Sequence, residues 1–325
     1  MPKEYQVAVI VPVYKVEKFV ERGVRSLLEQ SLASIQYIFV DDHGRDDSMK
    51  IIRDTVATYP ERLADVLYLT TEKNSGAATA RNVGLAQVNA QYTAFCDADD
   101  WIEKDAFERL YTHAIKEDLD IVWSDFVFDT TAGEQVCKQD FDTSNDSCIR
   151  NLLMENMHGA LWNKLYKSDM FRHHGISFLD GYDLWEDLNA NVRLFFYAKK
   201  IGYLPAAFYH YIQYNTNSLV TGISEKKIKD MLVNTDFIIS FLTQNRPGFF
   251  DKEIMFLKLA AKKTLLFSLD IESFKSWRRL YAEANPYIMS FKKLPLHLRF
   301  LGWASANGVW PVVRLYIQAK KLKTR

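Results

Sequence analysis

The stretch "QVAVIVPV", Gln6–Val13, is an almost continuous apolar run near the start of the chain. Such a run is typical of a strand that is covered on both faces, whereas a half-exposed strand alternates polar and apolar residues. Apolar residues then recur at helical spacing from Val16 to Leu28, as in an amphipathic helix packed on a sheet. The stretch therefore predicts the first strand of a parallel α/β sheet.

The same alternation continues through residue 128. We expect further strands at Tyr37–Asp42, Asp65–Thr70, Tyr92–Cys96 and Ile121–Phe128, and helices at Met49–Tyr59, Gly76–Val88 and Asp105–Lys116. Strands and helices joined by short connections predict a doubly wound, mostly parallel sheet. From about Thr130 the pattern changes to polar loops, short helices and one strand, "FYHYIQY", and beyond Ser224 it is helical. We therefore expect one domain over 1–222, with halves 1–128 and 129–222, and a helical extension over 223–325.

Composition excludes several classes of protein. The 325 residues carry 41 Lys and Arg against 41 Asp and Glu, so no overall field points to nucleic acid. The three cysteines show no metal-binding spacing, which favours free thiols in a reducing compartment. The N-terminus lacks a signal-peptide pattern, and the longest uncharged apolar segment, 300–313, is too short to span a membrane. We expect a soluble, cytoplasmic protein.

Two acidic groups follow predicted strands, "VDDHGRDD" after the second and "AFCDADDW" after the fourth. Ligands of open parallel sheets bind beyond these carboxyl ends. In an extended segment Asp97 and Asp99 project to one side while Ala98 turns away. Carboxylates suit Mg²⁺ or Mn²⁺, and a substrate's phosphates would complete the coordination. The alternative is helix capping with solvated charge.

Seven segments together resemble family 2 glycosyltransferases of the GT-A fold. They are "VAVIVPVYKVEKFVERGVRSLLEQS", "YIFVDDHGRDDS", "NSGAATARNVGL", "FCDADDW", "LWNKLYKSDMF", "GYDLWEDLNANVRLFFYA" and "FYHYIQYNTNSL". They occur in the family's order over about the first 220 residues. The resemblance implies an inverting, metal-dependent transfer of a hexosyl or N-acetylhexosaminyl group from a nucleotide-diphosphate sugar, expected to be a UDP-sugar, with Mn²⁺ or Mg²⁺. The acceptor would be a hydroxyl of a glycan or lipid-linked molecule in cell-surface polysaccharide synthesis.

The resemblance assigns donor binding to residues at the strand ends. Pro12, Val13 and Tyr14 would line the nucleotide pocket. Asp42 would accept a hydrogen bond from the base, commonly the uracil N3–H. The His-Gly pair that follows Asp42 departs from the family's more frequent Gly-Ser, which leaves the choice of base open.

The second acidic group and two basic side chains complete the donor site. The resemblance places Asp97 at the ribose with Ala98 beside it, and Asp99 on the metal that bridges the phosphates. Arg81 would lie near the nucleotide, although it could simply pair with a neighbouring acid. His210 could approach the metal or diphosphate, or be a core histidine.

The reaction also needs a general base for the acceptor hydroxyl. The resemblance gives this role to Asp187, with Glu186 as its companion; without it, the two acids would be ordinary first-turn charges of a helix. Lys164 could neutralise phosphate or cap the local fold. Trp185 and Tyr182 could form a platform for a sugar acceptor or pack in the core.

Other functions remain open at this point. A sugar-1-phosphate nucleotidyltransferase has a similar sheet, but its glycine-rich loop after the first strand is absent from "VPVYKVEK". A nucleotide-sugar-binding protein without catalysis would not need both Asp99 and Asp187. A purely structural partner protein leaves the acidic strand ends unexplained. Neither the sugar, the acceptor, the linkage nor the oligomeric state follows from the sequence.

The end of the sequence is basic and aromatic. After Glu283 it holds eight Lys or Arg and no acidic residue. We expect peripheral association with the anionic cytoplasmic face of the membrane, where a lipid-linked acceptor would lie. The apolar side chains expected to take part are Leu294, Leu296, Leu298, Phe300, Trp303 and Trp310. The alternative is helices packed on the catalytic domain with a solvated basic face.

Overall fold

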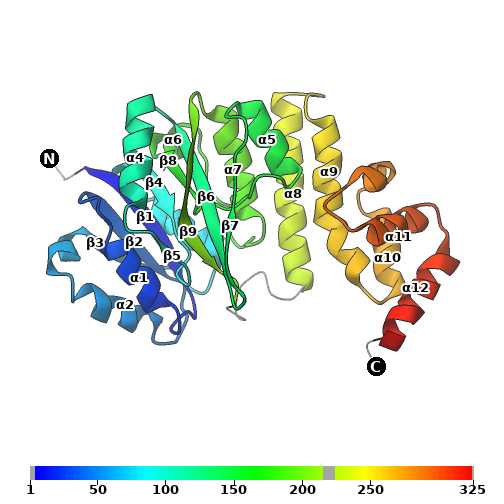
Figure 1. Cartoon of the computed structure of the whole chain (residues 1–325), viewed down its shortest axis with the longest axis horizontal. Helices are drawn as coiled ribbons and strands as arrows, with labels where there is room; N and C mark the ends of the chain where they lie inside the picture. The colour runs from blue at the N-terminus through cyan, green and yellow to red at the C-terminus, as the bar shows by residue number, and fades with distance from the viewer. Residues whose placement is uncertain (1–3, 215–223, 324–325) are drawn as a thin grey trace. The chain divides into compact units, whose positions relative to one another are not determined.

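The computed structural model describes residues 4–214 and 224–323. The chain divides into two compact units, the first built from residues 1–149 and 158–230 and the second from 150–157 and 231–325. The change from one unit to the other therefore falls inside helix α8 (Glu225–Asn245). Figure 1 shows a sheet with covering helices in the first unit and helices alone in the second.

The first unit is organised around strand β1 (Tyr5–Val13), which lies between β2 (Ile35–Asp41) and β4 (Ala90–Phe95). Strand β3 (Val66–Thr70) pairs with the outer edge of β2, and all these pairs are parallel. The order β3-β2-β1-β4 confirms the parallel α/β arrangement expected from the N-terminal pattern. Because strand order reverses at β1, the crevice beyond its carboxyl end is where such sheets bind ligands.

Helices cover both faces of these strands. The odd-numbered side chains of β1, Val7 to Val13, share a core with α1 (Val20–Leu28) and α2 (Ser48–Val56). The same core includes α4 (Ala106–Glu117), which packs against β6 and β9. On the other face, Ile10 meets α3 (Ala77–Leu85). The four helices lie within a few residues of their expected positions, and the two-sided cover accounts for the near absence of alternation in β1.

The rest of the sheet is mixed rather than parallel. Strand β6 (Ile121–Thr130) is separated from β4 by the short antiparallel strand β8 (Lys164–Lys167), so the fourth and fifth expected strands are not neighbours. Strand β9 (Ile201–Ile212) runs parallel to β6, whereas β5 (Trp101–Ile102) and β7 (Gly133–Cys137) add antiparallel pairs. The three unpredicted strands are too short to carry a periodic signal.

The remaining described elements of the first unit are helical. They are the 3₁₀ helix η1 (Pro60–Asp65), α6 (Asp169–His173), α7 (Glu186–Tyr197) and the start of α5 (Asn145–Leu153).

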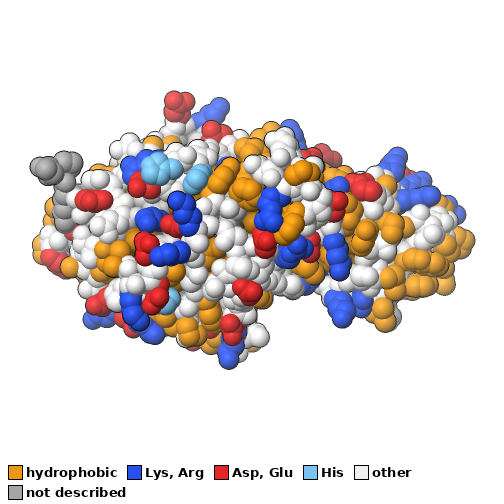
Figure 2. All heavy atoms as spheres, turned by 90° about the horizontal axis from the view of Figure 1, so that it is seen from above, with side chains coloured by type: hydrophobic (Ala, Val, Ile, Leu, Met, Phe, Trp, Pro, Cys, Tyr) orange, Lys and Arg blue, Asp and Glu red, His pale blue; other side chains and the backbone are white. Residues whose placement is uncertain are grey.

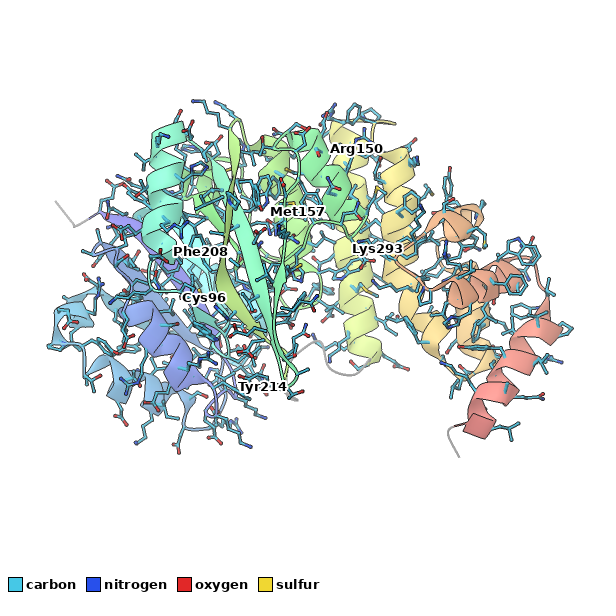
Figure 3. The ribbon with its side chains drawn as sticks, viewed as in Figure 1. Cys96, Arg150, Met157, Phe208, Tyr214 and Lys293 are labelled. Carbon is cyan, nitrogen blue, oxygen red and sulfur yellow. The ribbon has the colours of Figure 1, made fainter. Side chains whose placement is uncertain are left out.

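All three cysteines are free thiols, as the sequence predicted. Cys96 is buried just beyond the end of β4 (Figure 3).

The second unit is helical, as expected. After α8 it contains α9 (Asp251–Lys262), η2 (Lys263–Phe267), α10 (Ile271–Arg279), η3 (Ala282–Ser290), α11 (Leu296–Ala306) and α12 (Trp310–Lys323). Its centre holds the fully buried Lys262, whose Nζ donates to the carbonyls of Trp277, Leu280 and Tyr281. Among the described helices, none is both long and apolar enough to cross a membrane.

Two glycines permit close contacts beneath the carboxyl edge of the sheet. A Cβ on Gly23 of α1 would lie 2.5 Å from the backbone oxygen of Asp100, and one on Gly84 of α3 would lie 2.5 Å from Cγ2 of Ile10. The first contact presses a helix directly against the acidic turn that follows β4. That turn is therefore held by backbone as well as by side chains.

We predict that Gly23→Ala destabilises the first unit although it improves helix propensity. Overpacking typically costs about 1–3 kcal/mol, against a helix gain of about 1 kcal/mol, and the Asp100 carbonyl cannot rotate away. Gly84→Ala is the matched control, because the atom it meets belongs to a side chain that can adjust. Urea unfolding should give a lower midpoint for Gly23→Ala than for Gly84→Ala. Equal or higher stability of the Gly23 variant would contradict the tight contact.

Candidate active site

The ends of β1 and β2 form one side of the candidate site. Val13 is buried, Pro12 is partly buried and Tyr14 is 40% exposed, so this segment passes from the core to the surface. The Val13 carbonyl accepts a hydrogen bond from the Asp42 backbone N–H at 3.0 Å, which ties the two strand ends together. The three residues expected to line a nucleotide pocket thus lie beside Asp42.

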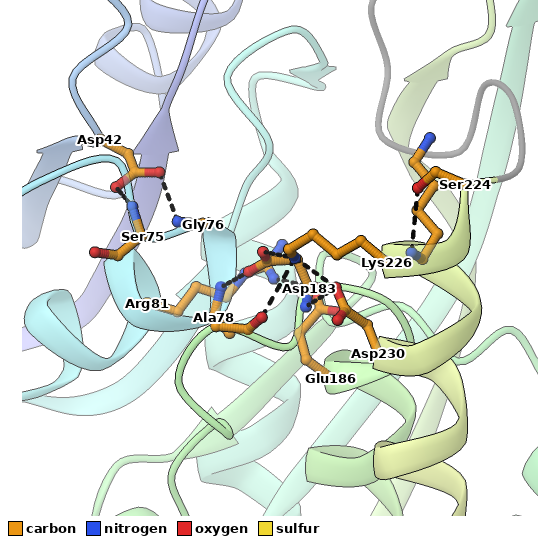
Figure 4. A network of polar contacts seen from close by, with 12 residues as sticks. Asp42, Ser75, Gly76, Ala78, Arg81, Asp183, Glu186, Ser224, Lys226 and Asp230 are labelled. Atoms are coloured by element: carbon orange, nitrogen blue, oxygen red, sulfur yellow. Dashed lines mark hydrogen bonds and ion pairs between the residues drawn. The ribbon is translucent and has the colours of Figure 1, made fainter.

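Asp42 is almost fully buried and holds the loop that leads into α3. Its Oδ1 accepts from the Ser75 N–H and its Oδ2 from the Gly76 N–H, each at 2.8 Å (Figure 4). Oδ1 also accepts from Thr71 Oγ1 at 2.8 Å. A carboxylate offers about four acceptor positions. These three bonds leave one position of Asp42 for a ligand.

The three carboxylates of the acidic turn after β4 differ in burial. Asp100 is buried and accepts from Tyr209 Oη and from the Ile212 N–H, both at 2.8 Å. Tyr209 Oη in turn accepts from the Asp97 N–H at 3.0 Å, so one tyrosine of β9 fixes both ends of the turn. Burial, followed by the charges of Asp99 and Asp97, raises the pKa of Asp100. Asp100 is a structural residue, whereas Asp97 and Asp99 stay partly exposed above the buried Ala98.

Arg81 joins this turn to the start of α7. Its guanidinium donates to Glu186 Oε1 at 2.6 Å and to Asp97 Oδ1 at 3.1 Å, and the residue is only 7% exposed. Burial alone would lower the pKa of Arg81, but Glu186, Asp97 and Asp187 together raise it. Arg81 therefore pairs with acids, which was one of the two alternatives, and it does so at the edge where the nucleotide was expected.

Glu186 and Asp187 occupy the first turn of α7, so the helix start brings both carboxylates to this edge. Burial and the neighbouring Asp187 raise the pKa of Glu186 to about 8, against the effect of Arg81. Burial also raises the pKa of Asp187, while Arg81 and the Leu188 N–H, which donates to Asp187 Oδ1 at 2.6 Å, oppose the increase. A carboxylate with a raised pKa is a stronger proton acceptor than an exposed one.

Lys164 is engaged within the fold. It is 1% exposed and lies at the start of β8, where Nζ donates to the carbonyls of His158 and Ala160 and to Asn163 Oδ1, at 3.0, 2.5 and 2.8 Å. Burial lowers the pKa of Lys164 to about 7. Its three N–H groups thus have acceptors in the 158–163 segment, which is the local structural role that the sequence left open.

His210 lies on β9, next to Tyr209, so the two side chains point to opposite faces of the strand. Its Nε2 is 3.0 Å from Glu103 Oε1, and its ring stacks on Trp101 with centroids 3.5 Å apart. The structure thus pairs His210 with Glu103 and Trp101, and its expected approach to a metal or diphosphate stays a prediction. Trp185 precedes Glu186 with a φ of 69°, half-buried, and its contact with an acceptor also stays a prediction.

The donor atoms suit a metal ion that a substrate helps to hold. Across residues 4–214 and 224–323, no three His, Cys, Asp or Glu side chains form a group that could bind a metal by themselves. Mg²⁺ usually takes one or two carboxylates together with water and substrate phosphates. Asp99 meets that requirement, since it lines an open cleft of about 790 Å³ with Lys18, Arg22 and Trp101.

Asp183 is a site residue that the sequence did not single out. Its Oδ1 accepts from the Ala78 N–H at 3.1 Å, in the first turn of α3, and its Oδ2 lies 3.4 Å from Lys226 Nζ (Figure 4). Lys226 also pairs with Asp230 at 2.6 Å. A Cβ on Gly76 would lie 2.0 Å from the Asp183 carboxylate, so this capping contact needs glycine. The only sequence signal was the position of Asp183 within "GYDLWED".

Comparisons with known proteins point to one family. The family model described as "Glycosyl transferase family 2" matches residues 8–177. The chain is 26% identical over 246 residues to the "Putative glycosyltransferase EpsH" of Bacillus subtilis, which covers 74% of this chain and 70% of that protein. It is 30% identical over 218 residues to the "Glycosyltransferase GlyA" of Streptococcus pneumoniae, covering 63% of this chain but only 30% of that protein.

A solved structure shows the same fold. S. aureus TarS 1–349 in complex with UDP-GlcNAc matches with a TM-score of 0.71 at 17% identity, over 93% of this chain and 92% of that one. The match extends over the sheet and the C-terminal helices, and it confirms the expected GT-A type of architecture.

We predict that Asp183→Ala loosens the start of α3. Loss of a side chain that caps a helix typically costs about 1 kcal/mol, and amide hydrogen exchange in the first turn of α3 should accelerate. Asp270→Ala is the matched control, because Asp270 caps α10 through the N–H groups of Glu272 and Ser273. That variant should accelerate exchange in α10 and leave α3 unchanged. Unaltered exchange of α3 in the Asp183 variant would show that the contact contributes nothing.

Proposed function

The chain belongs to glycosyltransferase family 2, and from that premise we propose that it moves a sugar from a UDP-sugar to a hydroxyl of a glycan or lipid-linked acceptor. The transferred group is a hexosyl or N-acetylhexosaminyl residue, and the product is part of a cell-surface polysaccharide. The observation that carries the proposal is the Arg81 bridge, which links the acidic turn at Asp97 to the carboxylates of α7. This bridge supports the proposal because it holds the segments proposed for donor binding and for acceptor activation at one edge of the sheet.

Recognition of the nucleotide base is assigned to Asp42. Its carboxylate accepts hydrogen bonds from Thr71, Ser75 and Gly76 and has one acceptor position left. An N–H group of the nucleobase would fill that position. A hydrogen bond to a charged group contributes about 1.5–3 kcal/mol, which is enough to favour a base with such a donor. Uracil N3–H satisfies this requirement, and TarS was solved with UDP and with UDP-GlcNAc. Pro12, Val13 and Tyr14 would pack against the base, and Asp97 with Ala98 would meet the ribose.

The diphosphate is assigned to Asp99 through Mn²⁺ or Mg²⁺. As a Lewis acid, a bound metal would stabilise the charge that develops on the departing diphosphate. Asp99 would hold the ion from the protein side, while the phosphates and water complete the coordination. Asp97 is already drawn toward Arg81, which supports giving the metal to Asp99.

Asp187 is assigned the role of general base. Glu186 is tied to Arg81, which leaves Asp187 as the carboxylate of α7 that can take the proton of an acceptor hydroxyl. Direct attack by that hydroxyl on the anomeric carbon would invert its configuration. Trp185, which immediately precedes these acids, is the candidate for contact with the acceptor. The enzyme would work at the cytoplasmic face of the membrane if the acceptor is lipid-linked.

We predict that Asp187→Asn reduces turnover by about 10²-fold or more, because the amide keeps the shape but cannot accept a proton. Affinity for the donor should remain close to wild type, since the base acts on the acceptor. The measurement is UDP release with donor and acceptor present, combined with donor titration by calorimetry. Wild-type turnover, or a loss fully matched by weaker donor binding, would remove Asp187 as the base. Absence of any UDP release by the wild type with every donor would instead favour a binding protein.

Glu186→Gln provides the control for this assignment. An ionised base is required, so activity should fall as the pH decreases through the raised pKa of Asp187. Burial and Asp187 raise the pKa of Glu186 to about 8, so Glu186 is protonated over the pH range in which Asp187 loses its proton. Glu186→Gln therefore replaces one neutral hydrogen-bonding side chain with another and should leave the acid limb of the kcat/KM profile in place, with a smaller loss of turnover than in Asp187→Asn. A loss of turnover as large as that of Asp187→Asn would contradict the assignment.

Mutations should separate the proposed metal-binding role of Asp99 from the proposed nucleobase-binding role of Asp42. Asp99→Ala should weaken UDP binding in the presence of Mn²⁺ and have little effect without it, because the ion loses its protein ligand. Asp42→Ala should weaken UDP binding under both conditions. Asp180→Ala removes an exposed carboxylate that accepts from the Asn82 side chain and should leave both affinities unchanged. Unchanged Mn²⁺-dependent binding by the Asp99 variant, measured by calorimetry, would show that the metal assignment is wrong.

A further inference from the structure

Helix α11 exposes a stripe of large apolar side chains. Leu296, Phe300 and Trp303 are 63%, 47% and 42% exposed. Their spacing of four and three residues places them on one face of the helix. The rings of Phe300 and Trp303 stack with centroids 5.6 Å apart. The opposite face is already occupied, because Leu298 and Leu301 are buried in the second unit.

The segments packed against α11 add to this surface. Leu315 and Leu322 of α12 are 68% and 74% exposed and lie seven residues apart, on one face. Met289 of η3 is 42% exposed, and its carbonyl accepts from Arg299 Nη1 of α11 at 2.9 Å. Figure 2 shows hydrophobic side chains gathered over the C-terminal helices, with Lys and Arg side chains among them. Helix α11 contacts both η3 and α12, and all three segments expose large apolar side chains. A gathering of this kind marks an interaction surface more often than single exposed residues do.

Basic side chains lie next to these apolar ones in the sequence. Lys292 and Lys293 precede α11 and Arg314 lies on α12; all three are exposed, and none forms an ion pair with the described residues. The last acidic residue of the sequence, Glu283, is paired with Lys258 at 2.6 Å. The surface therefore combines apolar contact area with positive charge that the unit does not neutralise.

We propose that this surface docks on an anionic lipid bilayer, with α11 lying in the plane of the interface. We call it the basic aromatic face, and its residues are Lys292, Lys293, Leu296, Phe300, Trp303, Arg314, Leu315 and Leu322. Its apolar side chains enter the headgroup region while the basic ones meet lipid phosphates. Only the purpose of this docking rests on the proposed function: it would hold the enzyme at the surface where a lipid-linked acceptor lies.

A second copy of the chain fits this face less well than a lipid surface. Two such faces in contact would oppose Lys and Arg with Lys and Arg, and like charges at an interface disfavour association. Anionic headgroups supply the missing negative charge. The structure also corrects the set of side chains expected from the sequence: Leu294 and Leu298 are each 2% exposed and belong to the core, and Trp310 is half-buried.

Sedimentation with vesicles tests the proposal, using vesicles of phosphatidylcholine alone and of phosphatidylcholine with phosphatidylglycerol. The full chain should sediment with the anionic vesicles at low salt. It should dissociate as salt rises from about 0.01 M to about 1 M, since the Debye length falls from about 30 Å to about 3 Å. The triple variant Lys292→Gln, Lys293→Gln, Arg314→Gln should bind roughly 10²-fold more weakly, at about fivefold for each charge. The variant Leu296→Ser, Phe300→Ser, Trp303→Ser should also lose binding.

Matched controls separate this face from general surface effects. Leu63, Ile115 and Val136 of the first unit are similarly exposed, and their triple replacement by Ser should bind as the wild type does. The charge control is Lys138→Gln, Lys229→Gln, Lys252→Gln, which removes the same number of exposed cations. Equal losses in the controls and in the face variants would overturn the assignment of the face.

Two further outcomes would also overturn the proposal. Wild-type protein that stays in the supernatant at low salt would show that no such docking occurs. A face variant that dissociates an oligomer, while vesicle binding persists, would make the face a contact between copies. UDP binding by calorimetry without vesicles should be the same in all variants, so failure of membrane docking and failure of the proposed donor site would appear in different measurements.

Discussion

The buried guanidinium of Arg81 is the interaction on which the site depends. It belongs to α3, yet it bonds the turn after β4 through Asp97 and the first turn of α7 through Glu186. Removing one partner of a buried ion pair typically costs about 3–5 kcal/mol, because the other charge is left without compensation. Three segments that are distant in sequence are thus held in register by one side chain. Lysine would not replace it, since a single ammonium lacks the planar, multiply donating geometry of arginine.

The same cluster sets the proton chemistry of the site. Asp97, Glu186 and Asp187 share one guanidinium, so together they carry more negative charge than Arg81 neutralises. Burial adds to the repulsion, and the pKa values of Glu186 and Asp187 rise together. A hydrophobic replacement of Arg81 would remove the counter-charge from all three acids at once. Arg81 thus influences both the position and the pKa of Asp187, the carboxylate proposed as the general base.

Much of the fold could be predicted from the sequence because long buried strands and amphipathic helices repeat their pattern over many residues. Strands β1, β2 and β4 and helices α1 to α4 are of this kind. The two-residue strand β5 and the four-residue strand β8 are not, and their pairing is decided by distant partners. The same limit applies to side chains. Adjacent carboxylates in "DADD" look alike in sequence, and only the contact with Tyr209 identifies Asp100 as structural. Likewise, Asp183 caps a helix more than a hundred residues earlier in the chain, which no local pattern encodes.

The glycine at position 23 has a consequence for the evolution and engineering of specificity. Because α1 meets the carbonyl of Asp100 at backbone distance, the acidic turn is supported by main chain as well as by the side chain of Tyr209. Substitutions cannot readily reshape that side of the site, so its preference for a ligand is inherited with the scaffold. By contrast, residues 131–136 are exposed and the 179–185 segment is exposed or half-buried, so apart from Asp183, which caps α3, these positions can change without disturbing the core. Libraries intended to alter the acceptor should therefore be confined to these two segments, with Asp183 and the strand ends left constant.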